Sequence, residues 1–475
     1  MGKIGNKKTL ITILTIALGT FMSALDSSIV NVVLPVIQTE FSVSLSTVEW
    51  VVIAYLMVIS SLLLTFGRLA DVYGHRKLYI TGFAVFTLGS LLCGLAESIQ
   101  LLVAFRVLQA IGAGMMFATG PAIITNAVPE QSRGKALSVT AIAVAVALCT
   151  GPVLGGILAS SIGWQSIFYI NVPVGILGTF LSLKNIDKDD RKGCGSFDYI
   201  GSILIFVALI LILLPLDLAG IENVNMTMFY SMLAAGIAIA AGFVVFEKTT
   251  PAPILNLELF KSRVFAAGNL SAVLNFMAQN IMVFLVPFYL EKLRMFSPVT
   301  AGLLYIPMPL ATLIIAPVSG AAADRFDSRY LSSAGMGIMS SGLFMLSFLK
   351  ADTPVWYMVT AMALAGLGSG MFQTPNNTAV MGSVPPEHRG IASGVLATMR
   401  NIGMVLGVAI SGALFTMNSI RANAFYGAQG LKEETLRQAS FIYALQITFT
   451  TAAAIALLAM ATSLIKGKMK KERKE

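Results

Sequence analysis

An acidic residue interrupts the first long apolar segment of the chain. Asp26 follows residues 9–25 and precedes residues 27–39, and neither stretch contains a charged side chain. A carboxylate at membrane depth must be hydrated, paired or protonated, and such residues usually have a function. Asp26 is therefore the leading candidate for a group that binds and releases a proton. The alternative is a structural aspartate that is linked to Asn31 across a polar helix face.

Two further residues are candidates for proton movement. Arg106 falls inside another apolar span with Gln109 one turn later, and a buried guanidinium can polarise water or stabilise a neighbouring carboxylate. We expect Arg106 to be the cationic neighbour of Asp26, or else a structural tie to backbone carbonyls. Glu49 precedes Trp50 at the outer end of the second span. It is either a second titrating acid or an interfacial charge beside an aromatic anchor.

The composition indicates that the chain lies in lipid. Of its 475 residues, 56% are hydrophobic and 12% are charged, whereas soluble domains are about a quarter charged. The net charge of +9 comes from short basic groups between apolar spans and from the tail, residues 466–474, which suits an anionic membrane surface rather than nucleic acid. The three cysteines and two histidines are scattered, so the sequence predicts no metal site, no cofactor and no enzyme. The sequence contains no P-loop, so ATP is not the expected energy source.

Charge-free windows of about 18 residues or more predict fourteen membrane-spanning helices. The long window at residues 136–183 must hold two of them, with a break near residues 160–163. If both termini are cytoplasmic, 24 of the 32 Lys and Arg residues fall in inner loops and tails, six in outer loops, and two inside spans. Positive residues concentrate on the cytoplasmic side of membrane proteins, so this asymmetry favours fourteen spans with both ends inside.

An internal repeat indicates two similar halves. Gly114, Val128, Pro129, Arg133 and Gly134 all recur 256 residues later. Parallel repeats of six helices are typical of one large class of transporters, which bind substrate between the halves. We expect an all-α polytopic membrane protein made of two six-helix bundles and two additional transmembrane helices. The expected parts are an N-terminal bundle at 1–186, the additional helices with cytoplasmic linkers at 187–262, a C-terminal bundle at 263–465 and a basic cytoplasmic tail at 466–475.

Five motifs in order along the chain resemble signatures of the major facilitator superfamily and of its fourteen-helix drug:proton antiporter branch, the EmrB/QacA type. They are Leu25-Asp26 to Leu34-Pro35, Gly67 to Lys77 (GRLADVYGHRK), Arg106 to Gly114 (RVLQAIGAG), Gly151 to Gly156 (GPVLGG) and Trp164 to Gly175 (WQSIFYINVPVG). The resemblance covers essentially the whole chain. It implies a major facilitator fold, proton-coupled transport and a role for Arg106 in proton movement.

The resemblance also implies that two groups of motif residues take part in conformational gating, through contacts made in one conformation and broken in another. The loop group consists of Gly67, Asp71, Gly74, Arg76 and Lys77, with Asp324 and Arg325 as a related pair in the second half. The helix group consists of Gly151, Pro152, Gly155 and Gly156, where small residues permit close packing and proline permits a bend. The superfamily pattern has Arg after the loop aspartate, whereas this chain has Val72.

Uncharged polar residues and one arginine are the candidates for a substrate cavity, although carboxamides in spans also bond neighbouring helices. The candidates are Asn31, Gln109, Asn275, Gln279, Asn280, Gln373, Asn376, Asn377 and Arg400. After Glu291 we find no acid well inside a span, and the thirteenth predicted helix contains Arg400 instead. Neutral, zwitterionic or anionic substrates are therefore favoured over dications.

The function expected from these features is export of amphipathic small molecules by alternating access, driven by the proton as coupling ion. Its alternatives are a dedicated exporter of one metabolite, peptide or lipid, and, from another class, a membrane sensor that does not transport. A sensor would be expected to lose Asp26, Arg106 or the Asp71 loop. We expect a monomer in a bacterial cytoplasmic membrane, with a small amphipathic substrate and membrane lipid as its partners and no nucleic acid.

Overall fold

The computed structural model describes residues 7–129, 132–187, 198–218, 226–250, 257–323, 326–385, 389–430 and 432–466. The regular secondary structure in these ranges is helical, as the sequence predicts. The long helices are α1 (Lys7–Glu40), α3 (Trp50–Tyr73), α4 (His75–Gly94), α5 (Ile99–Ala127), α6 (Arg133–Ser161), α8 (Asn171–Asn185), α9 (Tyr199–Leu218), α10 (Met226–Thr249), α11 (Arg263–Phe288), α13 (Pro307–Ala323), α14 (Ser328–Leu346), α15 (Val355–Gly382), α16 (Arg389–Ala428) and α17 (Glu433–Ile465). The shorter elements are α2 (Leu45–Val48), α7 (Ser166–Tyr169), α12 (Pro298–Tyr305), the 3-10 helix η2 (Leu257–Lys261) and the π-helix η3 (Tyr289–Leu293).

The repeat found in the sequence also sets where helices begin. Three helices of the first half begin at Lys7, Ile99 and Arg133, and the corresponding helices of the second half begin 256 residues later in each case. These pairs are α1 with α11, α5 with α15, and α6 with α16. The same spacing of polar and small residues therefore ends and restarts helices at equivalent places in both halves.

The helices form two separately packed units. One unit contains residues 1–210, 238–254 and 296–303, and the other contains 211–237, 255–295 and 304–475. The first six long helices lie in the first unit, and most of α11 to α17 lies in the second. Helices α9 and α10 are each divided between the two units, and the expected insert at 187–262 stays a prediction.

The expected count of fourteen spans is not reached. Twelve helices among the described residues are long and apolar enough to cross a membrane. Helix α9 contributes only a shorter apolar segment, Tyr199–Ile212, and α14 is not among the twelve. Five serines in the 19 residues of α14 reduce its apolar character. A search for charge-free windows misses this difference, because serine is uncharged but not apolar.

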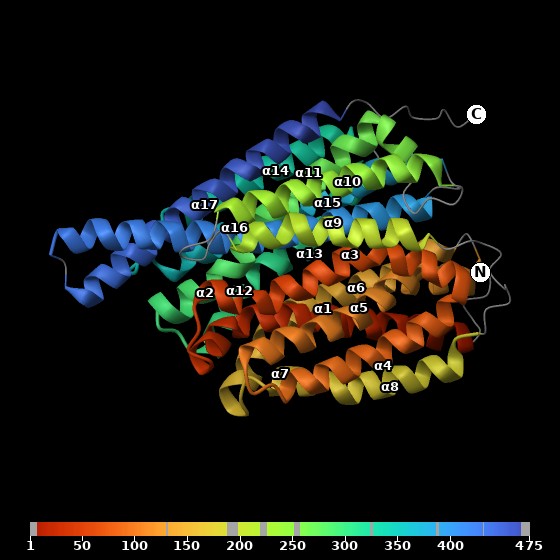
Figure 1. Ribbon diagram of the computed structural model, residues 1–475, viewed down its shortest axis with the longest axis horizontal. Helices are drawn as coiled ribbons and strands as arrows, with labels where there is room; N and C mark the ends of the chain where they lie inside the picture. The colour runs from red at the N-terminus through yellow and green to blue at the C-terminus, as the bar shows by residue number, and fades with distance from the viewer. Residues whose placement is uncertain are drawn as a thin grey trace. The chain divides into compact units, whose positions relative to one another are not determined.

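Close helix pairs depend on glycine at equivalent places. A Cβ atom at Gly112 of α5 would lie 2.3 Å from the backbone nitrogen of Phe86 in α4. A Cβ at Gly368 of α15 would lie 2.3 Å from the backbone nitrogen of Met339 in α14. Small residues let helix backbones approach where lipid supplies no hydrophobic driving force. These contacts hold α4 beside α5 and α14 beside α15 (Figure 1).

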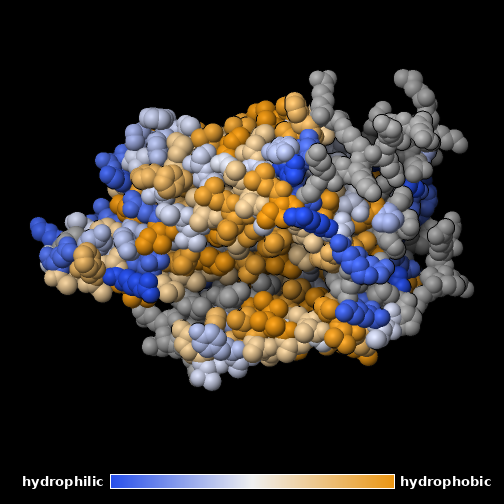
Figure 2. Space-filling model, turned by 90° about the horizontal axis from the view of Figure 1, so that it is seen from above, coloured by the Kyte–Doolittle hydropathy of each residue, from blue (hydrophilic) through white to orange (hydrophobic). Residues whose placement is uncertain are grey.

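The surface has the character expected of a membrane protein. Figure 2 shows hydrophobic residues across the middle of this face and hydrophilic residues gathered mainly toward its left and right ends. Helices α16 and α17 have 40 and 33 residues, more than the roughly 20 residues that cross a bilayer. Their connected ends extend as a hairpin, visible at the left of Figure 1.

Candidate functional site

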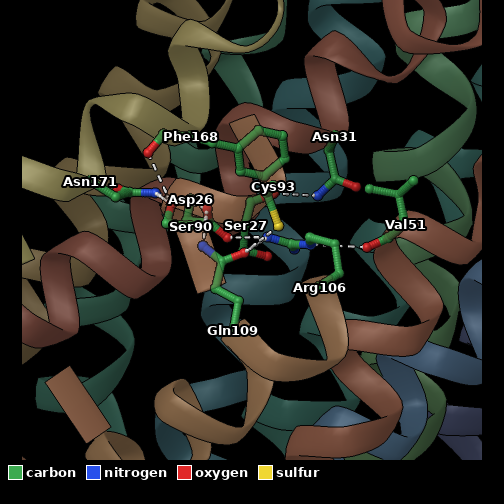
Figure 3. Close-up of polar contacts among 10 residues, drawn as sticks. All are labelled: Asp26, Ser27, Asn31, Val51, Ser90, Cys93, Arg106, Gln109, Phe168 and Asn171. Carbon is green, nitrogen blue, oxygen red and sulfur yellow. Dashed lines mark hydrogen bonds and ion pairs between the residues drawn. The ribbon is translucent and has the colours of Figure 1, made fainter. Parts of the chain in front are cut away.

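The carboxylate of Asp26 lies at the centre of a buried polar network in the first unit. Its Oδ2 accepts a hydrogen bond from Arg106 Nη1 at 2.6 Å, and its Oδ1 accepts one from Gln109 Nε2 at 2.9 Å (Figure 3). Oδ1 accepts another from Asn171 Nδ2, also at 2.9 Å. Asp26 and Arg106 are each only 1% exposed. The structure therefore brings together the two predicted proton-coupling residues, one from α1 and one from α5. Gln109, which was predicted to line a substrate cavity, bonds to this pair instead.

The guanidinium of Arg106 is held on several sides. Its Nε donates to the carbonyl oxygen of Val51 at 3.1 Å, and Nη1 also donates to Gln109 Oε1 at 2.7 Å. Its central carbon lies 4.0 Å from the centre of the Tyr55 ring, a cation–π distance. Arg106 thus bonds both a carboxylate and a backbone carbonyl, so it combines the two roles that the sequence left as alternatives. The contacts fix the guanidinium beside Asp26.

Asn171, which begins α8, belongs to the network although the sequence did not single it out. Its side chain donates to Ser90 Oγ at 3.0 Å as well as to Asp26, and Ser90 Oγ donates to the Phe168 carbonyl at 2.9 Å. Asn171 lies inside the motif from Trp164 to Gly175, which was recognised without a role for its asparagine. Membership of that motif was the feature of the sequence that could have identified Asn171 as a site residue. Short α7 and the turn before it bring Asn171 to the level of Asp26.

The other polar residues near this network have different contacts. Asn31 donates to the Ser27 carbonyl at 2.9 Å, so it does not bond the carboxylate of Asp26 as the structural alternative required. Glu49 is fully buried where α2 meets α3, two residues before Val51. This burial distinguishes Glu49 from an interfacial charge, which would face water. Its place in the chain puts it close to the carbonyl that binds Arg106.

The repeat provides a comparison within the chain. The residues 256 positions after Asp26 and Arg106 are Met282 and Met362, and both are fully buried. The second half therefore has two apolar side chains where the first half has an ion pair. A buried ion pair costs desolvation that methionine does not incur, so the first half bears a cost at these positions that the second half avoids.

A second polar cluster lies in the second unit and is uncharged. Ser369 Oγ lies 3.3 Å from Asn275 Oδ1 and 3.0 Å from Gln279 Oε1, and Gln373 Nε2 donates to Ser369 Oγ at 2.8 Å. The Nδ2 of Asn275 has no hydrogen-bond partner among the described residues. Three predicted cavity residues from α11 and α15 thus meet around Ser369, which the sequence analysis missed. We call these four residues the carboxamide cluster.

The remaining cavity candidates are dispersed. Asn280 donates to the carbonyl of Phe276 in its own helix at 2.9 Å. Asn376 is fully buried and binds Lys466, whereas Asn377 is exposed. Arg400 is half-buried on α16, and its Nε has no hydrogen-bond partner among the described residues. Arg400, like Asn275, therefore keeps a donor that no described residue uses.

The predicted gating residues divide into two settings. In the loop group, Asp71 lies 3.8 Å from Arg68 Nη1 and 3.7 Å from His75 Nε2, and Arg76 donates to the Leu183 carbonyl at 2.7 Å. Gly74 has a φ of 100° and ends α3, and no atom lies within 4 Å of a Cβ built at Gly67. Lys77 is exposed. Asp324 and Arg325 lie outside the described residues.

The helix group packs α6 against its neighbours inside the first unit. A Cβ at Gly151 would lie 2.7 Å from the Cβ of Ser28, and one at Gly155 would lie 3.1 Å from Ile29. Both contacts fall two to three residues after Asp26 in α1. Gly156 lies against Pro298 of α12, and Pro152 is inside α6. These glycines let α6 approach the segment of α1 that contains the acid.

Comparisons with known proteins point to one family. The profile of the Major Facilitator Superfamily matches residues 16–408 and, in an overlapping match, 268–466. The chain is 36% identical over 415 residues to the riboflavin transporter RibZ of Clostridioides difficile, covering 87% of this chain and 89% of that protein. It is 33% identical over 413 residues to the multidrug resistance protein Stp of Mycobacterium tuberculosis, covering 86% and 76%.

Solved structures show the same fold. A bacterial homologue of the human lysosomal transporter Spinster, in its inward-facing and unoccupied conformation, superposes with a TM-score of 0.69. The match covers 98% of this chain and all of that chain, at 18% identity. At that identity the likeness concerns the fold alone.

Proposed function

Because the chain belongs to the Major Facilitator Superfamily and is a membrane transporter rather than an enzyme, we propose that it exports amphipathic small molecules in exchange for protons. The observation that carries this proposal is the buried network of Asp26, Arg106, Gln109 and Asn171. A carboxylate that is held by three N–H donors at membrane depth has a stable ionised arrangement. It becomes a proton carrier when one of those donors leaves.

The geometry suggests which group competes with the proton. Arg106 Nη1 lies 2.6 Å from Asp26 Oδ2, so a proton that binds this oxygen displaces the guanidinium. We propose that a proton and Arg106 alternate on Asp26 as the protein changes conformation. Release of the proton then restores the ion pair. A substrate cation that competes directly for this carboxylate is less well supported, because Asp26 is closed off from solvent in this conformation.

The proposed topology keeps fourteen spans. Helices α9 and α14 have 20 and 19 residues, which at about 1.5 Å per residue reach close to the 30 Å of a bilayer core. We propose that both cross the membrane beside the twelve apolar spans, with both termini in the cytoplasm of a bacterium. This is the arrangement of the EmrB/QacA branch. We further propose a monomer surrounded by lipid, with no resident cofactor.

The polar residues of the second unit indicate which class of substrate the protein would bind. The carboxamide cluster offers neutral hydrogen-bond donors and acceptors, and Arg400 offers a cation with an unused donor. We propose that neutral or anionic amphipathic compounds are preferred to dications. A dedicated exporter of one metabolite is the second candidate, favoured by the likeness to a riboflavin transporter.

A substrate panel in everted membrane vesicles tests the proposed function. The panel contains riboflavin as a neutral compound, fluorescein as an anion and ethidium as a cation, with a pH-sensitive dye to report proton movement. We expect substrate-dependent proton movement for several compounds, and movement for only one would favour the dedicated exporter. Transport without any proton movement would contradict the proposed coupling.

Replacing Arg400 is expected to change substrate preference. In Arg400→Ala, transport of the anion should fall at least tenfold relative to riboflavin, because loss of a charged hydrogen bond costs about 1.5–3 kcal/mol. Proton movement per transported riboflavin should be unchanged. Arg421→Ala removes an exposed arginine from the same helix and is the matched control. Equal losses for all three compounds would show that Arg400 supports the helix rather than substrate selection.

A further inference from the structure

Lys466 is a buried lysine at the end of the last helix. It directly follows Ile465, where α17 and the final membrane span end, and its residue is only 1% exposed. The sequence assigns Lys466 to the basic cytoplasmic tail, which stays a prediction, and the structure adds that this lysine is buried. A lysine at a helix end normally extends its ammonium group toward water. Lys466 instead points into the second unit.

The side chain enters between three helices. Its Nζ donates a hydrogen bond to Asn376 Oδ1 of α15 and lies 5.6 Å from the centre of the Phe372 ring. A Cβ at Gly268 of α11 would lie 3.3 Å from the Cε of Lys466, so this glycine leaves room for the lysine stem. Asn376 Nδ2 donates to the Gly268 carbonyl at 3.2 Å, which turns its oxygen toward the lysine. Residues of α11 and α15 thus surround the amine of Lys466.

The two acidic groups described on neighbouring elements at this end of the unit form ion pairs with other residues. Helix α14 begins here, because Ser333 bonds the Met460 carbonyl of α17, and its Asp327 lies 4.0 Å from Arg329. Glu258 of η2 pairs with Lys261 at 2.8 Å. Arg263 is the first residue of α11, and α16, which also packs against α17, begins at Arg389 and contains Arg400. No carboxylate of the described ranges forms an ion pair with Lys466.

A protonated Lys466 would be a buried charge with one carboxamide and one ring as its partners. Burial of an ion without a counter-ion costs several kcal/mol, whereas a neutral amine can donate to Asn376 at much lower cost. Lysine resolves this conflict readily by losing its proton. Burial accordingly lowers the pKa of Lys466 to about 7.

We propose that Lys466 is a second proton-binding group of the transport cycle. Its amine is neutral while it is buried between α11, α15 and α17. When this end of the second unit opens to cytoplasmic water, the nitrogen lone pair takes a proton from hydronium and leaves a water molecule. Burial requires the reverse step, so Lys466 links closure of this end to cytoplasmic pH. This inference rests on the proposed transport function.

Thermal unfolding of the purified protein tests the protonation step without any substrate. The unfolded amine has its ordinary pKa near 10.4, so between about pH 7 and pH 10 the unfolded chain binds more protons and stability rises with pH. Lys466→Met keeps the length of the side chain but cannot titrate. We expect the Tm of Lys466→Met minus that of the wild type to be largest at pH 6–7 and to shrink by several degrees toward pH 10. Lys261→Met removes an exposed lysine and should show no such trend.

Substrate exchange tests the link to transport. Proteoliposomes with equal pH on both sides are loaded with the panel compound that the wild type moves best. Between pH 8 and pH 6 the wild-type exchange rate, divided by that of Lys466→Met, should fall about tenfold, because the neutral fraction of an amine with a pKa of about 7 falls by that factor. Lys466→Arg, which remains charged, should exchange slowly at both pH values.

The two measurements separate the possible failures. A difference in Tm that does not vary with pH would show that Lys466 stays charged and anchors α17, and it would overturn the proposal. A pH-dependent Tm difference together with identical exchange profiles would overturn the link to transport. A wild type that moves no compound of the panel would contradict the proposed function, and the Tm measurement would still decide the protonation state.

Discussion

Replacing Asp26 with asparagine is expected to abolish proton-coupled export. Asparagine keeps the size of the side chain and one oxygen for Gln109 and Asn171, but it has no site for a transferable proton. Substrate-dependent proton movement in everted vesicles should fall to the level of vesicles without the protein. Downhill exchange of substrate should remain measurable, because the proton step alone is removed.

The matched control is Asp352→Asn, which changes an exposed acid in the turn before α15 and should leave coupling intact. Asp26→Asn also leaves Arg106 without its counter-charge, so some loss of stability is expected. Transport is therefore compared per molecule of monodisperse protein after size-exclusion chromatography. Unchanged pH-dependent transport by the folded variant would remove Asp26 from the coupling mechanism.

Replacing Arg106 with leucine is expected to produce the largest loss of stability. The change removes the cation 2.6 Å from Asp26 and the donors to Val51 and Gln109, and it leaves a carboxylate buried without a counter-ion. Breaking a buried ion pair in this way costs about 3–5 kcal/mol. Thermal unfolding in detergent should show a lowered Tm, and coupled transport should be lost.

The double variant, Asp26→Asn with Arg106→Leu, separates the ion pair from the individual side chains. Because neither charge remains, it should recover much of the stability that Arg106→Leu loses, while transport stays absent. A Tm change for Arg106→Leu that is the same with Asp26 or Asn at position 26 would mean that the two residues are not energetically coupled. Arg421→Leu, on the exposed part of α16, serves as the control for the loss of an arginine.

The sequence predicted the helical class and the repeat well, because both depend on local composition. The break expected near residues 160–163 is confirmed: α6 ends at Ser161, and Gly163 has a φ of 113°. The number of membrane spans was harder to predict from the sequence than the helical class. Helix α14 has no internal acid, but its five serines lower its apolar character, and charge alone does not detect them.

The candidate site was predicted in part. Asp26 and Arg106 were recognisable because charged residues are costly in apolar spans, and their adjacency is confirmed at 2.6 Å. Asn171 and Ser369 were missed, because a neutral polar residue in a span is common and carries no such cost. Asn377 illustrates the opposite error, since its type suggested a cavity and the structure leaves it exposed.

By itself, the sequence determined that this protein lies in lipid, that it consists of two similar helical halves, and that it belongs to its superfamily. It also identified the acid on which coupling is proposed to depend. These properties follow from residue types and from spacing along one helix. Only the tertiary structure decided the partners of the charged groups. Asp26 bonds residues 80, 83 and 145 positions away, and Lys466 bonds one 90 positions away. Such contacts depend on which helix faces pack together. This packing gives Asp26 a counter-ion, whereas Lys466 has only a carboxamide and an aromatic ring as partners among the described residues.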